Sequence, residues 1–222
     1  MRSKQAIGEE QSQRLLIIES AIELFALKGA DKVTMRELTS HAKVNLGAVN
    51  YYFGSKEALA ETVFMELAKR VNGDRVKNLK QVLVQAASEA RVPNVDDIVD
   101  TFVEPYVASE ANAQAGQLLA QLILQHRLSP TPMTQRIIQK HFDPMAKKYV
   151  EALALARPGV DIRQFFWGYI FMVSTVVLTV SDRSPSNRLS RLSGGLADTN
   201  QRDELKQALL RFIVGGLKAT GD

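Results

Sequence analysis

The segment VNLGAVNYYFGSKEAL (Val44–Leu59) carries hydrogen-bonding side chains where a buried helix would carry leucines. It holds two tyrosines, two asparagines and two glycines within one short predicted helix and the turn after it. Amides and phenol hydroxyls both donate and accept hydrogen bonds, and tyrosine adds a flat ring. This combination suits the recognition of another polar surface.

Helical periodicity divides this segment into two faces. At about 100° per residue, Val49 and Phe53 fall on one side, where they can pack against the first helix of the chain. Gly47 and Tyr51 then point almost directly away from that side. The flanking positions are Ala48 and Asn50, with Tyr52 at the border.

An outward face of this kind fits the major groove of DNA. An asparagine amide can pair with adenine, a small or aromatic surface can meet the thymine methyl group, and tyrosine hydroxyls can reach phosphates. Backbone N–H groups at the start of the helix after Thr34 suit a phosphate, and Arg36 and Lys56 add positive charge. The predicted DNA-binding residues are Thr34, Arg36, Asn45, Leu46, Gly47, Ala48, Asn50, Tyr51, Tyr52 and Lys56. Singly, each also fits a structural role, and it is the joint pattern that favours DNA.

Four helices are predicted to position these residues. Their expected ranges are 14–28, 34–41, 46–53 and 56–72. Thr34 and Glu37 have the spacing of a capping box, and Asn45 is a predicted N-cap. Only a few residues join the second helix to the third, which is the arrangement of a helix-turn-helix. We therefore expect a DNA-binding domain at residues 1–55 and a second domain at residues 56–222.

The rest of the chain also reads as helical. The expected ranges are 75–90, 94–107, 112–128, 134–157, 161–180 and 201–217, with a mobile loop at 182–200 that includes one short helical turn. Pro144 should kink the helix at 134–157 or lie in its first turns. No useful stretch alternates with period two, so the predicted fold class is all-α without a sheet.

The composition is that of a soluble globular protein. The 222 residues carry a formal charge of +4 and the pI is about 9.3, values that permit a nucleic-acid partner without requiring one. The chain has no cysteine, which excludes disulfides and thiol catalysis, and its polar N-terminus does not resemble a secretory signal. The most apolar run, Phe165–Val180, is shorter than a membrane span of roughly 20 residues. We expect a cytoplasmic protein.

The joint pattern from Arg14 to Leu59 closely resembles the DNA-binding domain of the TetR family of bacterial transcriptional regulators. The resemblance identifies Leu46–Phe53 as the recognition helix and places Tyr51, Tyr52 and Lys56 at positions where family members contact DNA. Two residues depart from the family pattern. Asn50 stands where the family usually has a tyrosine, so an amide contact to a base replaces a ring contact to phosphate. Lys43 stands where the turn usually has glycine, which predicts a positive φ at Lys43, at a cost of about 1 kcal/mol or more.

A homodimer is expected because one recognition helix reads only a few base pairs. Two half-sites then lie about 34 to 36 Å apart, or a multiple of that distance, on a palindromic operator. The last two helices are the predicted four-helix interface, although they could instead be each subunit's own core. Predicted interface residues are Phe165, Gly168, Met172, Thr175, Leu205, Leu209, Phe212 and Gly216.

The family resemblance implies a small-molecule effector held between the middle helices. Predicted pocket residues are Phe102, Tyr106, Leu119, Leu122, His126, Phe142, Tyr149, Trp167 and Phe171. Aromatic residues at this spacing are also typical of an ordinary core. Their apolar character favours a hydrophobic or amphipathic effector. The segments HFDPMAKKYVEALALARPGVD and FFWGYIFMVS look like the C-terminal domain of a TetR subgroup that responds to fatty acids or acyl-CoA.

The expected function is a ligand-responsive regulator, most often a repressor in this family. Ligand binding would tilt the helix at 56–72 and change the separation of the two recognition helices. No catalytic or dinucleotide motif is present, and the three histidines are widely separated, so we predict no enzyme, cofactor or metal site. The alternative is a helical protein-interaction module that does not bind DNA.

Overall fold

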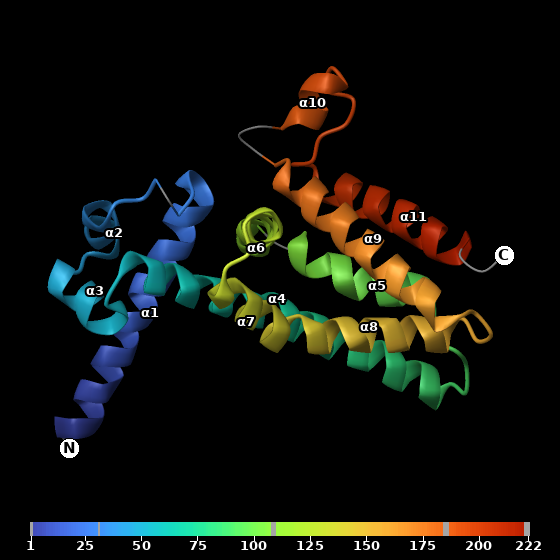
Figure 1. Cartoon of the computed structure of the whole chain (residues 1–222), viewed down its shortest axis with the longest axis horizontal. Helices are drawn as coiled ribbons and strands as arrows, with labels where there is room; N and C mark the ends of the chain where they lie inside the picture. The colour runs from blue at the N-terminus through green and yellow to red at the C-terminus, as the bar shows by residue number, and fades with distance from the viewer. Residues whose placement is uncertain (1, 31, 108–109, 184–186, 220–222) are drawn as a thin grey trace. The chain divides into compact units, whose positions relative to one another are not determined.

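The computed structural model describes residues 2–30, 32–107, 110–183 and 187–219, with side chains described for all of these except 2–9, 26 and 110–113 (Figure 1). The described residues contain helices and no strand, which confirms the all-α fold class. The chain separates into two compact units, Met1–Leu67 and Ala68–Asp222. The division falls inside a long helix, whereas the sequence places a domain boundary between residues 55 and 56, at the start of that helix.

The first unit contains α1 (Arg2–Lys28), α2 (Met35–Ala42), α3 (Leu46–Phe53) and the beginning of α4 (Lys56–Ser88). Its core is built largely from the apolar positions of α1. Ile17, Ile18, Ala21, Leu24 and Phe25 are all buried, as their spacing of three and four predicts. The bounds of α2 and α3 agree with the predicted helices to within a residue.

The first helix begins earlier than predicted, at Arg2 rather than Arg14. Residues 2–13, RSKQAIGEEQSQ, lack the apolar repeat that marks a helix packed on a core. They contain no proline and are rich in good helix formers, so the helix continues through them by propensity alone. Hydrophobic periodicity misses polar helical segments of this kind.

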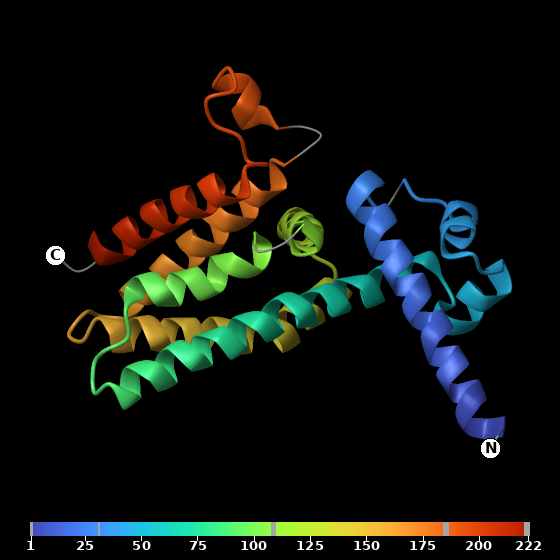
Figure 2. The ribbon, with the colours of Figure 1, turned by 180° about the vertical axis from the view of Figure 1, so that it is seen from behind.

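The described residues of the second unit contain the remainder of α4, seven further α-helices and a 3-10 turn. They are α5 (Val95–Val103), α6 (Glu110–Leu128), α7 (Pro132–His141), α8 (Asp143–Ala156), α9 (Ile162–Ser181) and α11 (Arg202–Ala219), with the short α10 (Arg188–Leu192) and a 3-10 turn at Glu104–Tyr106. Helices α5, α9 and α11 lie side by side in both views (Figures 1 and 2). Within the predicted loop at 182–200, residues 184–186 lie outside the described residues.

Three predicted helix boundaries are wrong. The predicted break near residue 73 does not occur, since α4 runs unbroken from Lys56 to Ser88. Gly73 costs a helix about 1 kcal/mol relative to alanine, and tertiary packing outweighs that amount. The helices predicted at 94–107 and 134–157 each stop near a proline, because Pro105 and Pro144 lack the N–H that would continue the hydrogen-bond ladder. Pro144 lies in the first turn of α8, at the break that divides the predicted helix in two.

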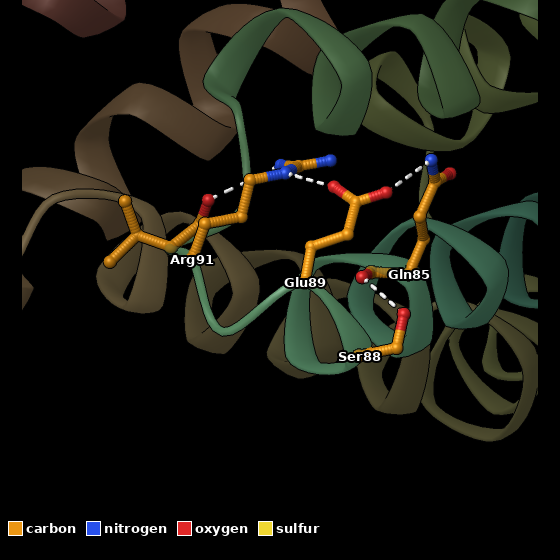
Figure 3. A network of polar contacts seen from close by, with 5 residues as sticks. Gln85, Ser88, Glu89 and Arg91 are labelled. Carbon is orange, nitrogen blue, oxygen red and sulfur yellow. Dashed lines mark hydrogen bonds and ion pairs between the residues drawn. The ribbon is translucent and has the colours of Figure 1, made fainter.

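The C-terminal end of α4 is held by local polar contacts (Figure 3). Gln85 Nε2 donates to one oxygen of Glu89 at 2.9 Å, and Arg91 Nε donates to the other at 2.5 Å. Ala90 has a φ of +50°, and the Arg91 N–H returns to the carbonyl of Ala86 at 3.0 Å. The left-handed conformation of Ala90 ends the helix and turns the chain. The hydrogen bonds from Gln85 and Arg91 to Glu89 stabilise this turn.

Helix α9 is long and apolar enough to cross a membrane by length and composition, and a third of its most apolar window (33%) is buried within the protein. It packs against α6, α8 and α11. One helix of this kind is weak evidence for a membrane, because the core helix of a soluble protein passes the same test. The exposed side of α9 carries large apolar side chains, among them Trp167, Phe171 and Leu178.

The turn between α2 and α3 allows a test of backbone strain. Lys43 has a φ of +53°, which confirms the prediction made from its place in the turn. We expect Lys43→Gly to raise the free energy of unfolding by about 0.5 to 1 kcal/mol, because glycine adopts this conformation without a steric penalty. Urea unfolding measures the change. Lys43→Ala is the matched control, since alanine loses the lysine side chain but keeps the strain; a gain as large as that for glycine would contradict the prediction.

Candidate functional site

Helix α3 is bounded on both sides by residues that satisfy its free backbone groups. Asn45 is the N-cap, and its Oδ1 accepts a hydrogen bond from the Ala48 N–H at 2.8 Å. At the other end Gly54 has a φ of +74° and its N–H donates to the carbonyl of Asn50 at 2.9 Å. These caps define a helix of eight residues with one buried and one exposed face.

The buried face of α3 anchors it to the rest of the first unit. Val49 is completely buried and Phe53 nearly so. The Arg14 guanidinium of α1 lies over the Phe53 ring, 5.5 Å from its centroid, in a cation–π contact. The inward positions predicted from periodicity are therefore the ones that the structure buries.

The opposite face of α3 is open to solvent. Tyr51 is 75% exposed and Leu46 is 50% exposed. Gly47 and Asn50 are also exposed, and Ala48 is half-buried. Small side chains beside an amide and a projecting phenol leave a surface narrow enough to enter a major groove. The DNA contacts of these residues stay a prediction.

The two tyrosines of α3 differ in their surroundings. Their rings meet edge to face with centroids 5.1 Å apart. The Tyr52 hydroxyl donates to Gln13 Oε1 of α1 at 3.2 Å, and Tyr52 is half-buried. Burial raises the pKa of Tyr52 above its ordinary value, with a smaller contribution from Glu10. Tyr52 therefore braces Tyr51 and α1, whereas Tyr51 presents its ring and hydroxyl outward.

The start of α2 carries a mixed charge. Thr34 Oγ1 accepts from the Glu37 N–H at 3.2 Å, which is one half of the predicted capping box. The Glu37 carboxylate pairs with Lys28 Nζ, and that hydrogen bond is the main cause of its lowered pKa. A carboxylate in this turn repels phosphate, and Lys28 offsets that repulsion. Arg36 is exposed one residue before Glu37.

The start of α4 supplies the last predicted contact. Ser55 Oγ accepts from the Ala58 N–H at 3.1 Å, which confirms that Ser55 caps the helix. Lys56, the first residue of α4, is half-buried. Arg36 and Lys43 precede α3 in the chain and Lys56 follows it. The helix-turn-helix therefore has positively charged residues on both sides of the recognition helix in the sequence.

In the second unit, most predicted pocket residues are core residues. Phe102, Tyr106, Leu119 and Tyr149 are at most 1% exposed, and Phe142 is buried as well. Leu122 and His126 are half-buried, and His126 Nδ1 lies 2.7 Å from Thr134 Oγ1, which joins α6 to α7. The aromatic side chains pack around a buried arginine, Arg75 of α4, that the sequence patterns did not single out. A signal for it existed, because Leu67, Val71, Arg75 and Leu79 follow one another at spacings of four.

Trp167 and Phe171 do not lie in the core with the other predicted pocket residues. Both are 62% exposed on α9, and their rings stack with centroids 6.1 Å apart. The buried stripe of α9 runs through Phe165, Gly168, Met172, Val176 and Val180. Trp167 and Phe171 lie on the side of α9 that faces away from this stripe. Apolar residues surround α9 so completely that periodicity could not select the inward side.

Most of the predicted interface residues are likewise inside the chain. Phe165, Leu205 and Leu209 are buried in a single subunit, and Gly168 and Met172 are buried as well but line the groove between α9 and α11. A Cβ on Gly168 would lie 2.4 Å from Leu217 Cδ2, so this glycine permits α9 to approach α11 within the chain. Thr175 is half-buried, and Phe212 and Gly216 are exposed.

An open groove of about 820 Å³ lies between α9 and α11. Phe171 from α9 and Phe212 from α11 are among its lining residues, beside Gly215 and Gly216. With Trp167 and Leu178, which are more than half exposed, these phenylalanines form an apolar surface that we call the outer α9–α11 surface. Large exposed apolar patches mark interaction sites in soluble proteins.

Family comparison identifies both units. Residues 17–63 match the family of bacterial regulatory proteins named tetR, and residues 100–216, more than half of the chain, match the tetracyclin repressor-like C-terminal domain. The chain belongs to the TetR family. It is a transcriptional regulator with a DNA-binding helix-turn-helix domain and a C-terminal ligand-binding domain. Members of the TetR family are DNA-binding regulators and not enzymes, and among the described residues no group of three or more histidine or acidic side chains forms a metal site.

Individual relatives support the same assignment. The chain is 26% identical over 103 residues to the HTH-type transcriptional regulator BetI of Rhizobium meliloti, which covers 46% of this chain and 51% of that protein. The chain spans about half the length of this curated relative and less of the others it matches. A linker-substituted mutant of HlyIIR has a TM-score of 0.64 at 15% identity, covering 96% and 99% of the two chains. The fatty acid degradation regulator FadR of Bacillus halodurans has a TM-score of 0.60 at 15% identity, covering 90% and 97%. These two structures show a shared fold.

The cap of the TetR recognition helix gives a stability prediction. We expect Asn45→Ala to lower the free energy of unfolding by about 1 kcal/mol, because the Ala48 N–H loses its side-chain acceptor. Asn50→Ala on the exposed face of the same helix should change it by less than about 0.5 kcal/mol. Urea or thermal unfolding of both variants measures the difference, and equal losses would show that Asn45 does not hold the helix.

Proposed function

We propose that this TetR-family chain is a repressor that binds a palindromic operator as a homodimer and is released by a hydrophobic or amphipathic effector. The observation that carries the proposal is the division of α3 into an anchored face, with Val49 and Phe53 buried, and a free face with Tyr51 projecting. The protein works in the bacterial cytoplasm and associates with the nucleoid when it is bound to its operator.

The outward residues of α3 act as the base-reading surface. Asn50 offers an amide that can bond to an adenine, and Gly47 leaves room for a base edge. Tyr51 and Lys56 reach phosphate oxygens, and backbone N–H groups after Thr34 meet a further phosphate. Tyr52 contributes mainly by positioning, since its hydroxyl is bonded to Gln13.

The outer α9–α11 surface serves as the dimer interface. It keeps Thr175, Phe212 and Gly216 from the set predicted from the sequence and adds the exposed Phe171. A Cβ added at Gly215 or at Gly216 would meet no other atom within 4 Å, so a partner helix can approach closely there. Two helices from each subunit then make a four-helix interface.

The long helix α4 provides the route between effector and DNA. It starts at Lys56, directly after the cap that follows α3, and continues without a break to Ser88 among the helices of the second unit. A ligand that shifts α4 changes the separation of the two recognition helices in the dimer, so ligand and DNA oppose each other with a coupling of about 1 to 3 kcal/mol.

The proposed class of effector is based on the apolar interior of the second unit. Its buried side chains are mainly aromatic and aliphatic, which favours a molecule with an apolar body. The likeness to a TetR subgroup that responds to fatty acids or acyl-CoA points the same way, and one solved structure of this fold is a fatty acid degradation regulator. We propose a fatty acid or a related amphipathic molecule as the effector.

Substitution on α3 tests DNA binding against the alternative of a protein-interaction module. The operator fragment is first selected from a random DNA pool. We expect Tyr51→Ala to weaken binding to it by about tenfold or more, because one base or phosphate contact contributes about 1 to 3 kcal/mol. Fluorescence anisotropy gives the affinity and circular dichroism checks the fold. Lys77→Ala on an exposed face of α4 is the control, and the affinity should fall steeply with salt. A failure to select any DNA would support the protein-interaction module.

Charge on the outer α9–α11 surface tests the dimer. We expect Phe212→Glu to raise the dimer dissociation constant by about thirtyfold or more, the equivalent of about 2 kcal/mol, because it buries a carboxylate at an apolar contact. Analytical ultracentrifugation measures the constant. Leu196→Glu is the matched control, since Leu196 is 88% exposed outside α9 and α11. An unchanged dimer in both variants would exclude this surface.

A further inference from the structure

The second unit contains a buried arginine at its centre. Arg75 of α4 is 1% exposed, which is rare for a permanently charged side chain. Its Nε donates to the carbonyl of Phe102 at 3.1 Å, and its Nη1 donates to Asn72 Oδ1 at 3.1 Å. A weaker contact joins Nη1 to Met145 Sδ at 3.9 Å. The guanidinium therefore connects α4 to α5 and α8.

Two aromatic rings lie against the guanidinium. The Arg75 Cζ atom lies 3.8 Å from the centroid of the Phe102 ring and 4.5 Å from that of the Tyr106 ring. Contacts of this kind attract a cation to the electron-rich ring face. They hold the guanidinium in place without neutralising its charge.

No carboxylate of the described residues forms an ion pair with this cation. Among the described residues Arg75 forms no ion pair, and its Nη2 is buried without a hydrogen-bond partner. Burial raises the pKa of Tyr149 to about 12 and also raises the pKa of Tyr169, so neither phenol becomes a phenolate near neutral pH. A buried charge without a counter-ion is strongly unfavourable, and an anion at Nη2 would remove that cost.

We propose that Arg75 binds the anionic group of the effector, and that the effector is an organic carboxylate with an apolar body. The inference rests on the proposed ligand response and specifies its chemistry. One guanidinium matches one negative charge, which favours a carboxylate over a dianionic phosphate ester. The aromatic rings of Phe102 and Tyr106 and the thioether of Met145 suit the apolar part of the molecule.

Met145 is the side chain that gives way to the carboxylate. A thioether is a weak acceptor on an unbranched, flexible side chain, so a carboxylate oxygen replaces it at Nη1 with a gain in hydrogen-bond strength. The same carboxylate reaches Nη2. The strong contacts of Arg75 to Phe102 and Asn72 remain, and Arg75 stays on the helix that begins at Lys56. Anion binding thus acts directly on α4.

The full-length wild-type protein gives the first test. Butyrate, octanoate, dodecanoate and benzoate are each titrated calorimetrically, beside the alcohol of the same carbon skeleton and inorganic phosphate. We expect at least one carboxylate to bind about tenfold or more tightly than its alcohol, because only the carboxylate forms the charged hydrogen bond. The proposal is overturned if no carboxylate binds, if the alcohols bind equally well, or if phosphate binds as tightly as the carboxylates.

A matched pair of variants places the anion at Arg75. We expect Arg75→Met to lose the preference for carboxylate over alcohol, whereas Lys77→Met, which removes an exposed cation from the same helix, retains it. Circular dichroism checks that each variant folds. If Arg75→Met does not fold, the titration of the wild-type protein with carboxylates and alcohols tests the proposal. An unchanged preference in folded Arg75→Met would overturn the proposal. Operator binding by the wild-type protein is measured in parallel without ligand. Absence of operator binding would contradict the proposed function. Operator binding by a protein that does not prefer carboxylates would contradict only this inference.

Discussion

A recognition helix of eight residues is too short to be stable alone, and the first unit is organised around this constraint. Asn45 and Gly54 satisfy its ends, while Val49 and Phe53 anchor one side in the core. Everything that stabilises α3 therefore acts on its inner face or its ends. The outer face is left free to carry Tyr51 and Asn50, residues that contribute little to folding and are suited to a partner.

Helices α9 and α11 of the second unit are apolar on the side that packs within the chain and also on the exposed side. The inner stripe of α9 packs against α11 through the close approach at Gly168, and the outer side of both helices remains apolar. Deeper in the unit, α4 passes through a packed aromatic core with a charged side chain, Arg75, held between two rings. An exposed apolar surface and an unneutralised buried charge are both costly in an isolated chain. These are the two places where we propose that a partner binds.

Much of the first unit could be predicted because its signals are local. Caps and a three-and-four repeat of apolar residues depend on neighbours within a few positions, whereas the left-handed turn at Lys43 was expected from the resemblance to the TetR family. The exposed face of α3 followed from that repeat. The second unit was harder to predict. Phe171 and Phe165 are six residues apart on a helix that is apolar almost all round, so nothing local distinguishes the buried phenylalanine from the exposed one.

The sequence by itself determined the helical class, the helix-turn-helix and the family, because each depends on residue types at short, regular spacings. The tertiary structure decided that α4 runs unbroken past Gly73, that Trp167 faces solvent, and that Arg75 is buried without a counter-ion. The physical reason is that periodicity divides a helix into faces but does not say what covers them. Burial, and the cost of burying a charge, depend on elements that are distant along the chain.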